Sequence, residues 1–400
     1  MSSAAVPTLS QVVALLDRRY PPGTAQSWDA VGLVAGDPGH PVHRVLFAVD
    51  PVAAVVDEAL DWGADLVVTH HPLLLRPVHG VAATTAKGAV LHRLVRSDVG
   101  LYAAHTNADA AAGGVADALA AAVGLVDTEP LVATDGPALD KHVVFVPVAE
   151  AERVVDAMAA AGAGAIGEYS RCAWTGTGEG TFVPSPDAHP AVGRAGEVTR
   201  VPEARVEMVA PRHLRTAVLA AMRTAHPYEE PAFDVLEQAG LPGGTGLGRV
   251  GRLPEPVTLD AFARAVAAAL PWTPQGVRYA GSPDLLVRRV AVLGGSGDSE
   301  LDAVRAAGVD AYVTSDLRHH PVSEQRERAM FEGPGVPALV DTAHFASEWP
   351  WLPVAAATLE RDLTALGATV GIRVSTLRTD PWTARVDGPA PRPGAPEGDS

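Results

Sequence analysis

Short apolar runs alternate with amphipathic segments in the first part of the chain. Apolar runs of strand length cover 44–49, 65–69 and 100–104. Segments with apolar residues every three or four positions, which is the helical spacing, cover 9–19, 51–61, 89–96 and 115–123. Strands that alternate with helices in this way predict a parallel sheet with helices on its faces.

The pattern changes in the middle of the chain. Strands are predicted at 141–148, 204–209 and 231–236, helices at 149–161 and 212–225, and a Gly-rich stretch runs from 162 to 196. This order is typical of an α+β domain of ferredoxin-like kind. The glycines of Leu241–Gly251 (LPGGTGLGRVG) then indicate a linker that leads back to the first type of pattern.

Alternation returns in the last part of the chain, with helices at 259–270, 299–307 and 351–366 and strands at 289–293, 310–314 and 337–340. We therefore predict an α/β fold with two outer α/β lobes, at 1–132 and 245–387, and an inserted ferredoxin-like α+β domain at 138–240. The remaining segment, 388–400, is rich in Pro and Gly and is expected to be a disordered tail.

The acidic composition narrows the possible partners. The chain has 31 Lys and Arg against 47 Asp and Glu, a net charge of −16, whereas nucleic acid and anionic lipid attract clustered cations. No apolar run approaches the roughly 18 residues of a membrane helix, and the N-terminus lacks the basic start of a signal peptide. We therefore expect a cytoplasmic protein with no membrane partner and no nucleic-acid partner.

The single cysteine, Cys172, excludes an internal disulfide and a thiolate metal cluster within one chain, and we expect it to be buried.

Polar residues that can bind metals follow most of the predicted strands of the outer lobes. They are Asp50; His70 and His71; His105, Asn107 and Asp109; Ser315 and Asp316; and Asp341, His344 and Glu348. Because the carboxyl ends of parallel strands share one edge of a sheet, where open α/β folds bind ligands, we expect these residues to gather there.

His70 and His71 directly follow an apolar strand. Neighbouring residues of a strand point to opposite sides, so we expect one metal ion for each imidazole rather than one ion held by both. A His-His pair on a protein surface often has no function, and it is the buried strand before this pair that favours a metal site.

His344 and Glu348 are four residues apart, which on a helix places both within reach of one ion. The same spacing is common by chance on solvated helix faces. Asp109 adds a carboxylate, and Glu348 could bridge two ions. The predicted ligands are thus His70, His71, Asp109, His344 and Glu348. This nitrogen and oxygen set suits two divalent ions of Zn, Mn, Fe, Co or Ni and does not select among them.

Two such ions would activate a shared water at neutral pH and polarise an electrophile. They carry +4, two carboxylates carry −2 and a bridging hydroxide −1, so a surplus of about +1 would attract a phosphate or another anion.

Three further motifs have both a functional and a structural interpretation. Gly294–Gly297 (GGSG) lies between a predicted strand and a predicted helix, where it would cradle a phosphate or form a plain tight turn. His319 and His320 are acid/base or supporting groups, or surface residues. The motif at 226–231 (HPYEEP) is a ligand or, as we prefer, a turn-capping element.

Seven motifs together carry a family resemblance: SWDAVGL (27–33), THHPLLL (69–75), HTNADAA (105–111), GEYSRC (167–172), HPYEEPAFD (226–234), GGSG (294–297) and VDTAHFASE (340–348). With them, the chain resembles the Nif-three-like dinuclear metal-centre family, whose bacterial members are also named GTP cyclohydrolase 1 type 2 homologues. The resemblance extends over nearly the whole chain, up to the tail.

The resemblance implies that the five predicted ligands hold two metal ions on a face shared by the outer lobes, and that His105 beside them acts as acid or base. It also implies a toroidal homohexamer whose metal sites face an internal cavity, and a PII/CutA-like inserted domain. The chain differs at Ala30, Ala108, Ser315 and Ala343, where members often have Asn, Leu, Gly and Gly. None of these removes a ligand, but Ala343 would alter the backbone approach to the site.

Three functions fit these observations. The first is a metal-dependent hydrolase that acts on a nucleotide or another phosphorylated or anionic compound, for which the resemblance supplies GTP cyclohydrolase activity. The second is a non-catalytic metal-handling or regulatory ring whose inserted domain senses a ligand or a partner. The third, a ring around nucleic acid, is disfavoured by the net charge of −16.

Overall fold

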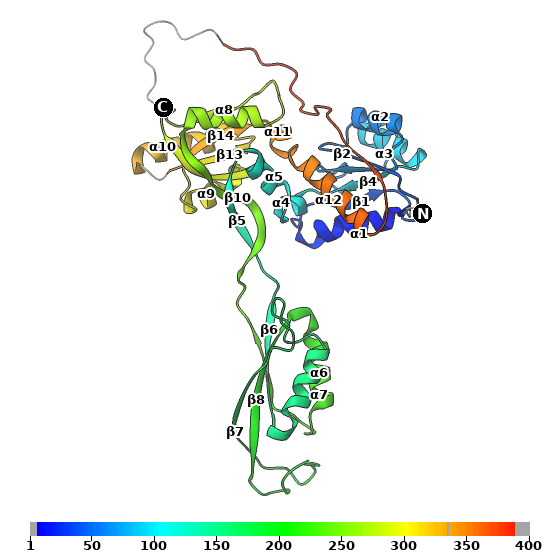
Figure 1. Cartoon of the computed structure of the whole chain (residues 1–400), viewed down its shortest axis with the longest axis vertical. Coiled ribbons are helices and arrows are strands. Elements are labelled where there is room, and N and C mark those ends of the chain that lie inside the picture. The colour runs from blue at the N-terminus through cyan, green and yellow to red at the C-terminus, as the bar shows by residue number, and fades with distance from the viewer. Residues whose placement is uncertain (1–5, 334–335, 389–400) are drawn as a thin grey trace. The chain divides into compact units, whose positions relative to one another are not determined.

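A computed structural model describes residues 6–333 and 336–388 of the chain (Figure 1). The chain forms two compact units. Unit 1 consists of Met1–Thr134 and Gly244–Ser400, and unit 2 of Asp135–Gly243. The expected tail, apart from its first residue, lies outside the described residues. No described helix is long and apolar enough to cross a membrane.

The first sheet of unit 1 has the strand order β1-β4-β3-β2-β15. Its strands are β1 (Gly32–Ala35), β2 (Arg44–Ala48), β3 (Leu66–Thr69), β4 (Gly100–Ala103) and β15 (Gly371–Val374). Strands β4, β3, β2 and β15 are parallel, and β1 runs antiparallel to β4. The C-terminal strand β15 therefore completes a sheet that the N-terminal part of the chain begins.

Both faces of this sheet are covered by helices. The helices are α1 (Leu9–Arg19), α2 (Ala53–Trp62), α3 (Ala86–Arg96) and α12 (Trp351–Ala365). Along β2, Val45 and Phe47 pack in a core with α1 and α12, whereas Leu46 packs in a second core with α2 and α3. Successive residues of a strand face opposite sides, so a continuous apolar run serves both cores.

The second sheet of unit 1 has the order β11-β14-β13-β12-β10-β5. Its strands are β5 (Val126–Asp135), β10 (Pro242–Thr258), β11 (Arg278–Ala280), β12 (Leu286–Ser296), β13 (Ala311–Ser315) and β14 (Ala338–Thr342), and its helices are α5 (Val115–Ala122), α8 (Leu259–Ala269), α9 (Leu301–Ala306) and α10 (His319–Glu332). Strands β12, β13 and β14 are parallel, while β10 is antiparallel to β12 and β11 is antiparallel to β14. Both sheets were predicted to be parallel, but they are mixed, because the antiparallel strands β1, β10 and β11 flank the parallel ones.

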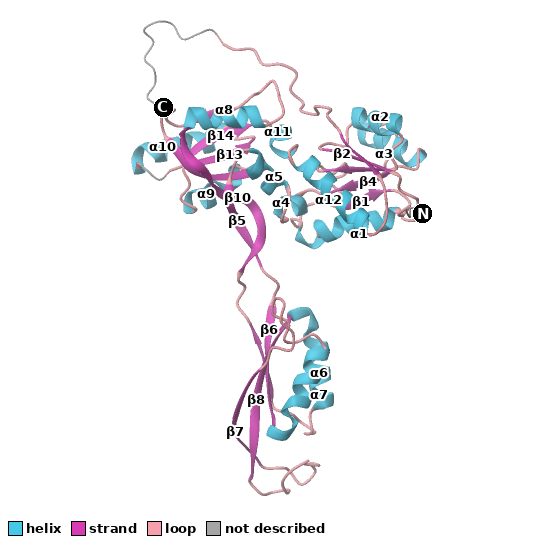
Figure 2. Cartoon of the chain, viewed as in Figure 1, coloured by secondary structure: helices cyan, strands magenta, loops and turns pink. Residues whose placement is uncertain are grey.

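Unit 2 has the element order β6 (Leu139–Pro147), α6 (Ala151–Ala160), β7 (Trp174–Phe182), β8 (Thr199–Pro211), α7 (Arg215–Ala225) and β9 (Phe233–Glu237). Its antiparallel sheet has the order β7-β8-β6-β9. Helices α6 and α7 lie along the same face of this sheet (Figure 2) and close a core around Val144 and Met158.

Two expectations are corrected by the structure. The segment predicted as a linker, Leu241–Gly251, lies almost wholly in strand β10, which pairs with β12. Its glycines permit a close strand approach, since a Cβ on Gly246 would lie 2.1 Å from the Val132 carbonyl oxygen. Cys172, expected to be buried, is only partly buried.

The chain leaves unit 1 and returns to it at neighbouring points. The Thr134 and Thr245 hydroxyl oxygens lie 2.8 Å apart. Two residues further on, the Gly136 N–H donates to the Leu241 carbonyl at 2.8 Å. Unit 2 is therefore an insertion between two paired strands rather than a segment at one end of unit 1.

Candidate metal centre

All five predicted ligands, and His105, belong to unit 1 and follow the carboxyl ends of its parallel strands. His70 and His71 follow β3, and His105 follows β4. Asp109 lies in α4 (Thr106–Ala110), and α11 (His344–Glu348), which follows β14, carries the other two ligands. The two sheets thus bring together residues that are far apart in the sequence.

The carboxylate of Glu348, 2% exposed, lies at the middle of the ligand cluster, by which we mean His70, His71, Asp109, His344 and Glu348. Glu348 Oε1 is 2.9 Å from His344 Nε2 and 3.4 Å from His70 Nε2, and Oε2 is 3.2 Å from His71 Nε2. Asp109 Oδ1 lies 3.8 Å from His70 Nε2. His71 and His344 bring their Nε2 atoms within 3.2 Å of each other.

The histidines share one mode of support, in which Nδ1 is held from behind and Nε2 points to the cluster. His70 Nδ1 is 2.9 Å from the Ala104 carbonyl, His71 Nδ1 2.7 Å from Asp50, and His344 Nδ1 2.6 Å from Asp316. This arrangement fixes the tautomer that presents an Nε2 lone pair, and histidines that ligate metals are commonly held in this way.

The carboxylates also set the protonation of the histidines. Burial alone would lower the pKa of His71 and His344, but Glu348 and the carboxylates of Asp50 and Asp316 outweigh it, raising the pKa of His71 to about 11 and that of His344 to about 10. In return, the neighbouring histidines hold the pKa of Glu348 well below its usual range in spite of its burial. In the metal-free protein, protons therefore occupy nitrogens that a metal ion would take.

Two buried atoms of the cluster lack a hydrogen-bond partner within the described part of the chain. They are His70 Nε2 and Glu348 Oε2. Both lie close to oppositely charged groups, but without the alignment of a hydrogen bond. Buried polar atoms are rarely left unpaired, so these two are available to a metal ion. One ligand atom from each of His71, His344 and Glu348 lies within 4.8 Å of the other two. The same holds for His70, His71 and His105. The residues present fit a metal centre.

Gly294–Gly297 forms part of the wall of this cluster rather than an anion cradle. Gly294 and Gly295 belong to β12, and a Cβ on Gly295 would lie 2.7 Å from Glu348 Oε1. The Gly295 N–H donates to the Ser347 hydroxyl at 2.9 Å. Most of the segment is therefore strand rather than the plain tight turn expected from the sequence, and its glycines allow the backbone to approach Glu348 closely.

The remaining histidine motifs contribute none of the ligand atoms described above. His226 in unit 2 uses both nitrogens locally: Nε2 lies 3.0 Å from the Phe145 carbonyl, and Nδ1 accepts from the Tyr228 N–H. His319 and His320 are exposed residues at the start of α10. Both motifs therefore take their structural interpretation.

The backbone at Ala343, where relatives often have Gly, does not require glycine. This residue precedes α11 with φ −71°, a conformation open to any residue. An alanine is therefore accommodated there without strain.

The sequence did not reveal the role of Asp29. Its carboxylate is fully buried and accepts a hydrogen bond from His105 Nδ1 at 2.8 Å. The residue stands in the SWDAVGL motif, but this motif carries no metal-ligand spacing, and His105 is 76 positions away. Asp50 and Asp316 were expected along one sheet edge, but they follow strands of two different sheets, β2 and β13, and their carboxylates pair with Nδ1 of His71 and of His344.

Known proteins match the chain over most of its length. A model of the Duf34/NIF3 (NGG1p interacting factor 3) family matches residues 7–381. A Mycobacterium leprae protein named GTP cyclohydrolase 1 type 2 homolog is 52% identical over 377 residues, which cover 94% of each chain. A Bacillus subtilis protein of the same name is 39% identical, with 84% of this chain and 88% of the relative covered.

Solved structures of related proteins also match the chain over most of its length. A Bacillus cereus protein related to NIF3 matches with a TM-score of 0.72 and 38% identity, covering 95% of this chain and 99% of that chain. A Staphylococcus aureus protein matches with a TM-score of 0.80 and 26% identity, again covering 95% and 99%. The mixed α/β architecture with several sheets is thus common to these proteins.

Proposed function

Since this chain belongs to the Duf34/NIF3 family, we propose that it is a metal-dependent hydrolase with a dinuclear centre that acts on a nucleotide or another phosphorylated compound. The observation that carries the proposal is the convergence of three imidazoles on the buried Glu348 carboxylate, with His70 Nε2 and Glu348 Oε2 left without hydrogen-bond partners among the described residues.

In this proposal, His70, Asp109 and Glu348 hold one divalent ion, and His71, His344 and Glu348 hold the other. Glu348 Oε1 lies 2.9 Å from His344 Nε2 and 3.4 Å from His70 Nε2, so this carboxylate reaches a histidine of each proposed set, which supports a bridging role. The ions, when bound, would lower the pKa of a bound water and polarise a phosphoryl oxygen. The ligand set is compatible with Zn, Mn, Fe, Co or Ni.

The charge of the site bears on its substrate. Asp29, Asp50 and Asp316 stand behind the histidines and add −3, so the surplus of about +1 estimated from the ligands alone becomes about −2. An anionic substrate would therefore be held by direct contact with the ions rather than by the net charge of the site.

Metal content is the first test. We expect about two transition-metal ions per chain by mass spectrometry of protein purified without chelator, and a loss of at least one in His71→Ala. His92→Ala, an exposed histidine of α3, is the matched control and should retain the wild-type content. Absence of metal from the wild type, even after reconstitution, would rule out the hydrolase.

The substrate is tested separately. Relatives carry the name GTP cyclohydrolase 1 type 2 homolog, so GTP is the first compound to offer to the metal-loaded protein. Release of formate would support that activity. If GTP yields neither formate nor phosphate, this specific assignment fails, and a panel of nucleotides and phosphodiesters follows.

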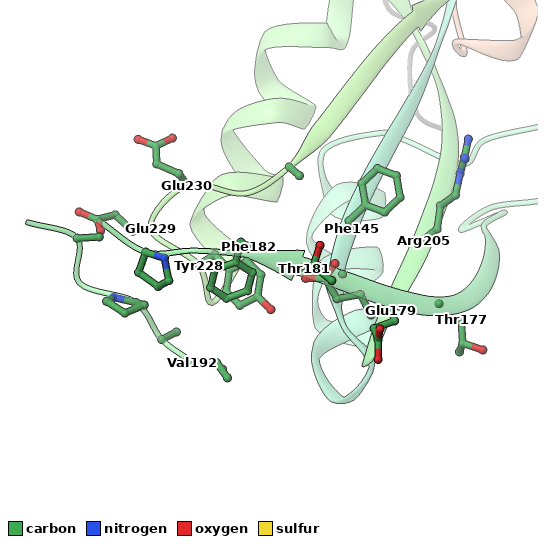
Figure 3. Close-up of a pocket in the computed structure, with 18 of the residues that line it drawn as sticks. Phe145, Thr177, Glu179, Thr181, Phe182, Val192, Arg205, Tyr228, Glu229 and Glu230 are labelled. Atoms are coloured by element: carbon green, nitrogen blue, oxygen red, sulfur yellow. The ribbon is translucent and has the colours of Figure 1, made fainter. Parts of the chain in front are cut away.

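A second candidate function, a metal-handling or regulatory ring, is favoured by a cavity of about 720 Å³ in unit 2 (Figure 3). Aromatic side chains of Phe145, Phe182 and Tyr228 line it together with Glu229 and Glu230. Its volume is within the range of small-molecule sites, so unit 2 could act as a sensor. If His71→Ala abolishes turnover and the cellular phenotype together, a purely structural ring is excluded.

The same proposal extends to assembly and location. The element order of unit 2 and its strand order β7-β8-β6-β9 support a ferredoxin-like, PII/CutA-like domain. We propose domains at 1–132, 138–240 and 245–387, a toroidal homohexamer in the cytoplasm, and no nucleic-acid partner. Sedimentation velocity at several protein concentrations tests the hexamer.

A further inference from the structure

His105 lies beside the ligand cluster but is not one of the histidines that approach its central carboxylate, Glu348. Its ring centroid is 5.2 Å from that of His70 and 5.6 Å from that of His71. Among the described residues, Glu348 is approached within 4.0 Å by three histidines, His70, His71 and His344, and His105 is not one of them. One ring nitrogen of His105 nevertheless lies within 4.8 Å of ring nitrogens of His70 and His71, so metal ligation by His105 is the alternative that the test below must exclude.

His105 is held by Asp29, a residue of the irregular segment before β1. Besides the His105 Nδ1–H, this buried carboxylate accepts the Ala30 N–H at 2.7 Å, the Thr106 N–H at 3.0 Å and the Thr106 hydroxyl. The four donors fill both oxygens. An ionised carboxylate only accepts hydrogen bonds, so the His105 proton resides on Nδ1 and Nε2 carries the lone pair.

The surroundings leave His105 Nε2 available. No hydrogen bond of this atom is found among the described residues, and the His105 side chain is 16% exposed. The exposed Trp28 indole stands edge-on to the imidazole at 5.9 Å. The ring is thus fixed on one side by Asp29 and accessible on the side next to His70 and His71.

We infer that Asp29 is a positioning residue that keeps His105 as the proton acceptor of the reaction, with Nε2 free of metal. The inference rests on the proposed hydrolase function. In the step, an O–H bond of the attacking water breaks, its electron pair stays on oxygen, and the proton forms a bond with His105 Nε2. Asp29 remains ionised and stabilises the resulting imidazolium.

The test compares Asp29→Asn, His105→Gln and the double variant with the wild type. Asp37→Asn is the control, because Asp37 is exposed and its carboxylate accepts the Gly39 N–H within a local turn. We expect every variant to keep the wild-type metal content. With bis(p-nitrophenyl) phosphate as probe, His105→Gln should lose about 100-fold in turnover. Asp29→Asn should lose at least about 10-fold, and the double variant no more than His105→Gln, because Asp29 acts through His105.

A second readout does not depend on turnover. Diethyl pyrocarbonate acylates free imidazole nitrogens, so in the metal-loaded wild type His105 should be modified before His70, His71 and His344. Asp29→Asn should slow this modification several-fold, because an amide N–H turned toward Nδ1 would favour the tautomer with its proton on Nε2, the nitrogen that is acylated.

Four results would overturn the inference. Loss of metal in His105→Gln, or protection of His105 by metal, would make His105 a ligand. Additive losses in the double variant would give Asp29 a structural role independent of His105. Equal labelling of His105 in the wild type and Asp29→Asn would remove the positioning role. If the wild type does not turn over the probe at all, the hydrolase proposal loses its support, and labelling alone decides on Asp29.

Discussion

Gly295 shows how closely the backbone approaches the ligand cluster. It adopts φ +72°, and a Cβ there would lie 2.7 Å from Glu348 Oε1 and 3.4 Å from His344 Nε2. We expect Gly295→Ala to displace the Glu348 carboxylate and to lower the metal content by at least one ion per chain, measured by mass spectrometry.

The chain offers a matched control for this substitution. Gly367 adopts φ +73°, and a Cβ there would have no atom of the described residues within 4 Å. An L-residue in this conformation costs about 1 kcal/mol at either position, so both variants should lose similar backbone stability while only Gly295→Ala loses metal. Equal metal content in the two variants would show that the approach to Glu348 is not required.

Protonation of the cluster predicts pH-dependent metal binding. The carboxylates raise the pKa of His71 to about 11 and that of His344 to about 10, so both nitrogens tend to hold protons at pH 7. A metal ion must displace these protons, so the affinity should rise with pH between 6 and 8, by about tenfold per pH unit for each proton released. Calorimetry in buffers of different ionisation heat should detect about one to two protons per chain. An affinity independent of pH over this range would contradict the proton competition.

At the scale of elements, Arg249 of β10 forms hydrogen bonds with residues in and before α5. Its side chain is 2% exposed and donates to both oxygens of Asp117, at 2.5 and 3.0 Å, and to the carbonyls of Gly246, Gly248 and Ala111. Arg249→Leu would leave these acceptors without their partner. We expect unfolding in urea to require about 3 kcal/mol less free energy.

Arg252 on the same strand is the control for this substitution. Its side chain is 48% exposed and pairs with Asp127, which is 65% exposed. Exposed ion pairs contribute about 0–1 kcal/mol, so Arg252→Leu should have little effect on the free energy of unfolding. A comparable loss in both variants would indicate that burial of Arg249 does not matter for stability.

The sequence reveals elements and residues to different degrees. The buried strands β2, β3, β4, β13 and β14 were predictable because each is a short apolar run, and the polar residues that follow them include the candidate ligands. Strand β7 (WTGTGEGTF) was missed because glycines replace the apolar residues of an alternating pattern. Strand β15 is four residues long and pairs with β2, whose position is more than 300 residues earlier, so no local signal indicates it. Asp29 was missed for a similar reason, since its partner His105 becomes visible only after folding.

At the scale of the whole molecule, the insertion of unit 2 between β5 and β10 allows a direct test of whether unit 1 folds and binds metal without unit 2. The Thr134 and Thr245 hydroxyl oxygens are 2.8 Å apart, so a short Gly/Asn turn can replace residues 135–243. We expect the shortened protein to fold and to keep the wild-type metal content, because every predicted ligand belongs to unit 1. His71→Ala in the shortened protein is the control that should lose metal. A shortened protein that folds but binds no metal would show that unit 2 contributes to the centre.

The pairing of β15 with β2 also determines the order of events during synthesis on the ribosome. Unit 2 is complete once residue 243 has been made, whereas the first sheet of unit 1 must wait for Gly371–Val374 and the ligand cluster for Glu348. The nascent chain thus carries His70, His71 and Asp109 through most of translation without the residues that complete the centre. Contacts so distant in sequence form late and slowly. The full ligand set that we propose for the metal ions therefore exists only after Glu348 has been made, and early capture of an ion by the two histidines would compete with correct assembly.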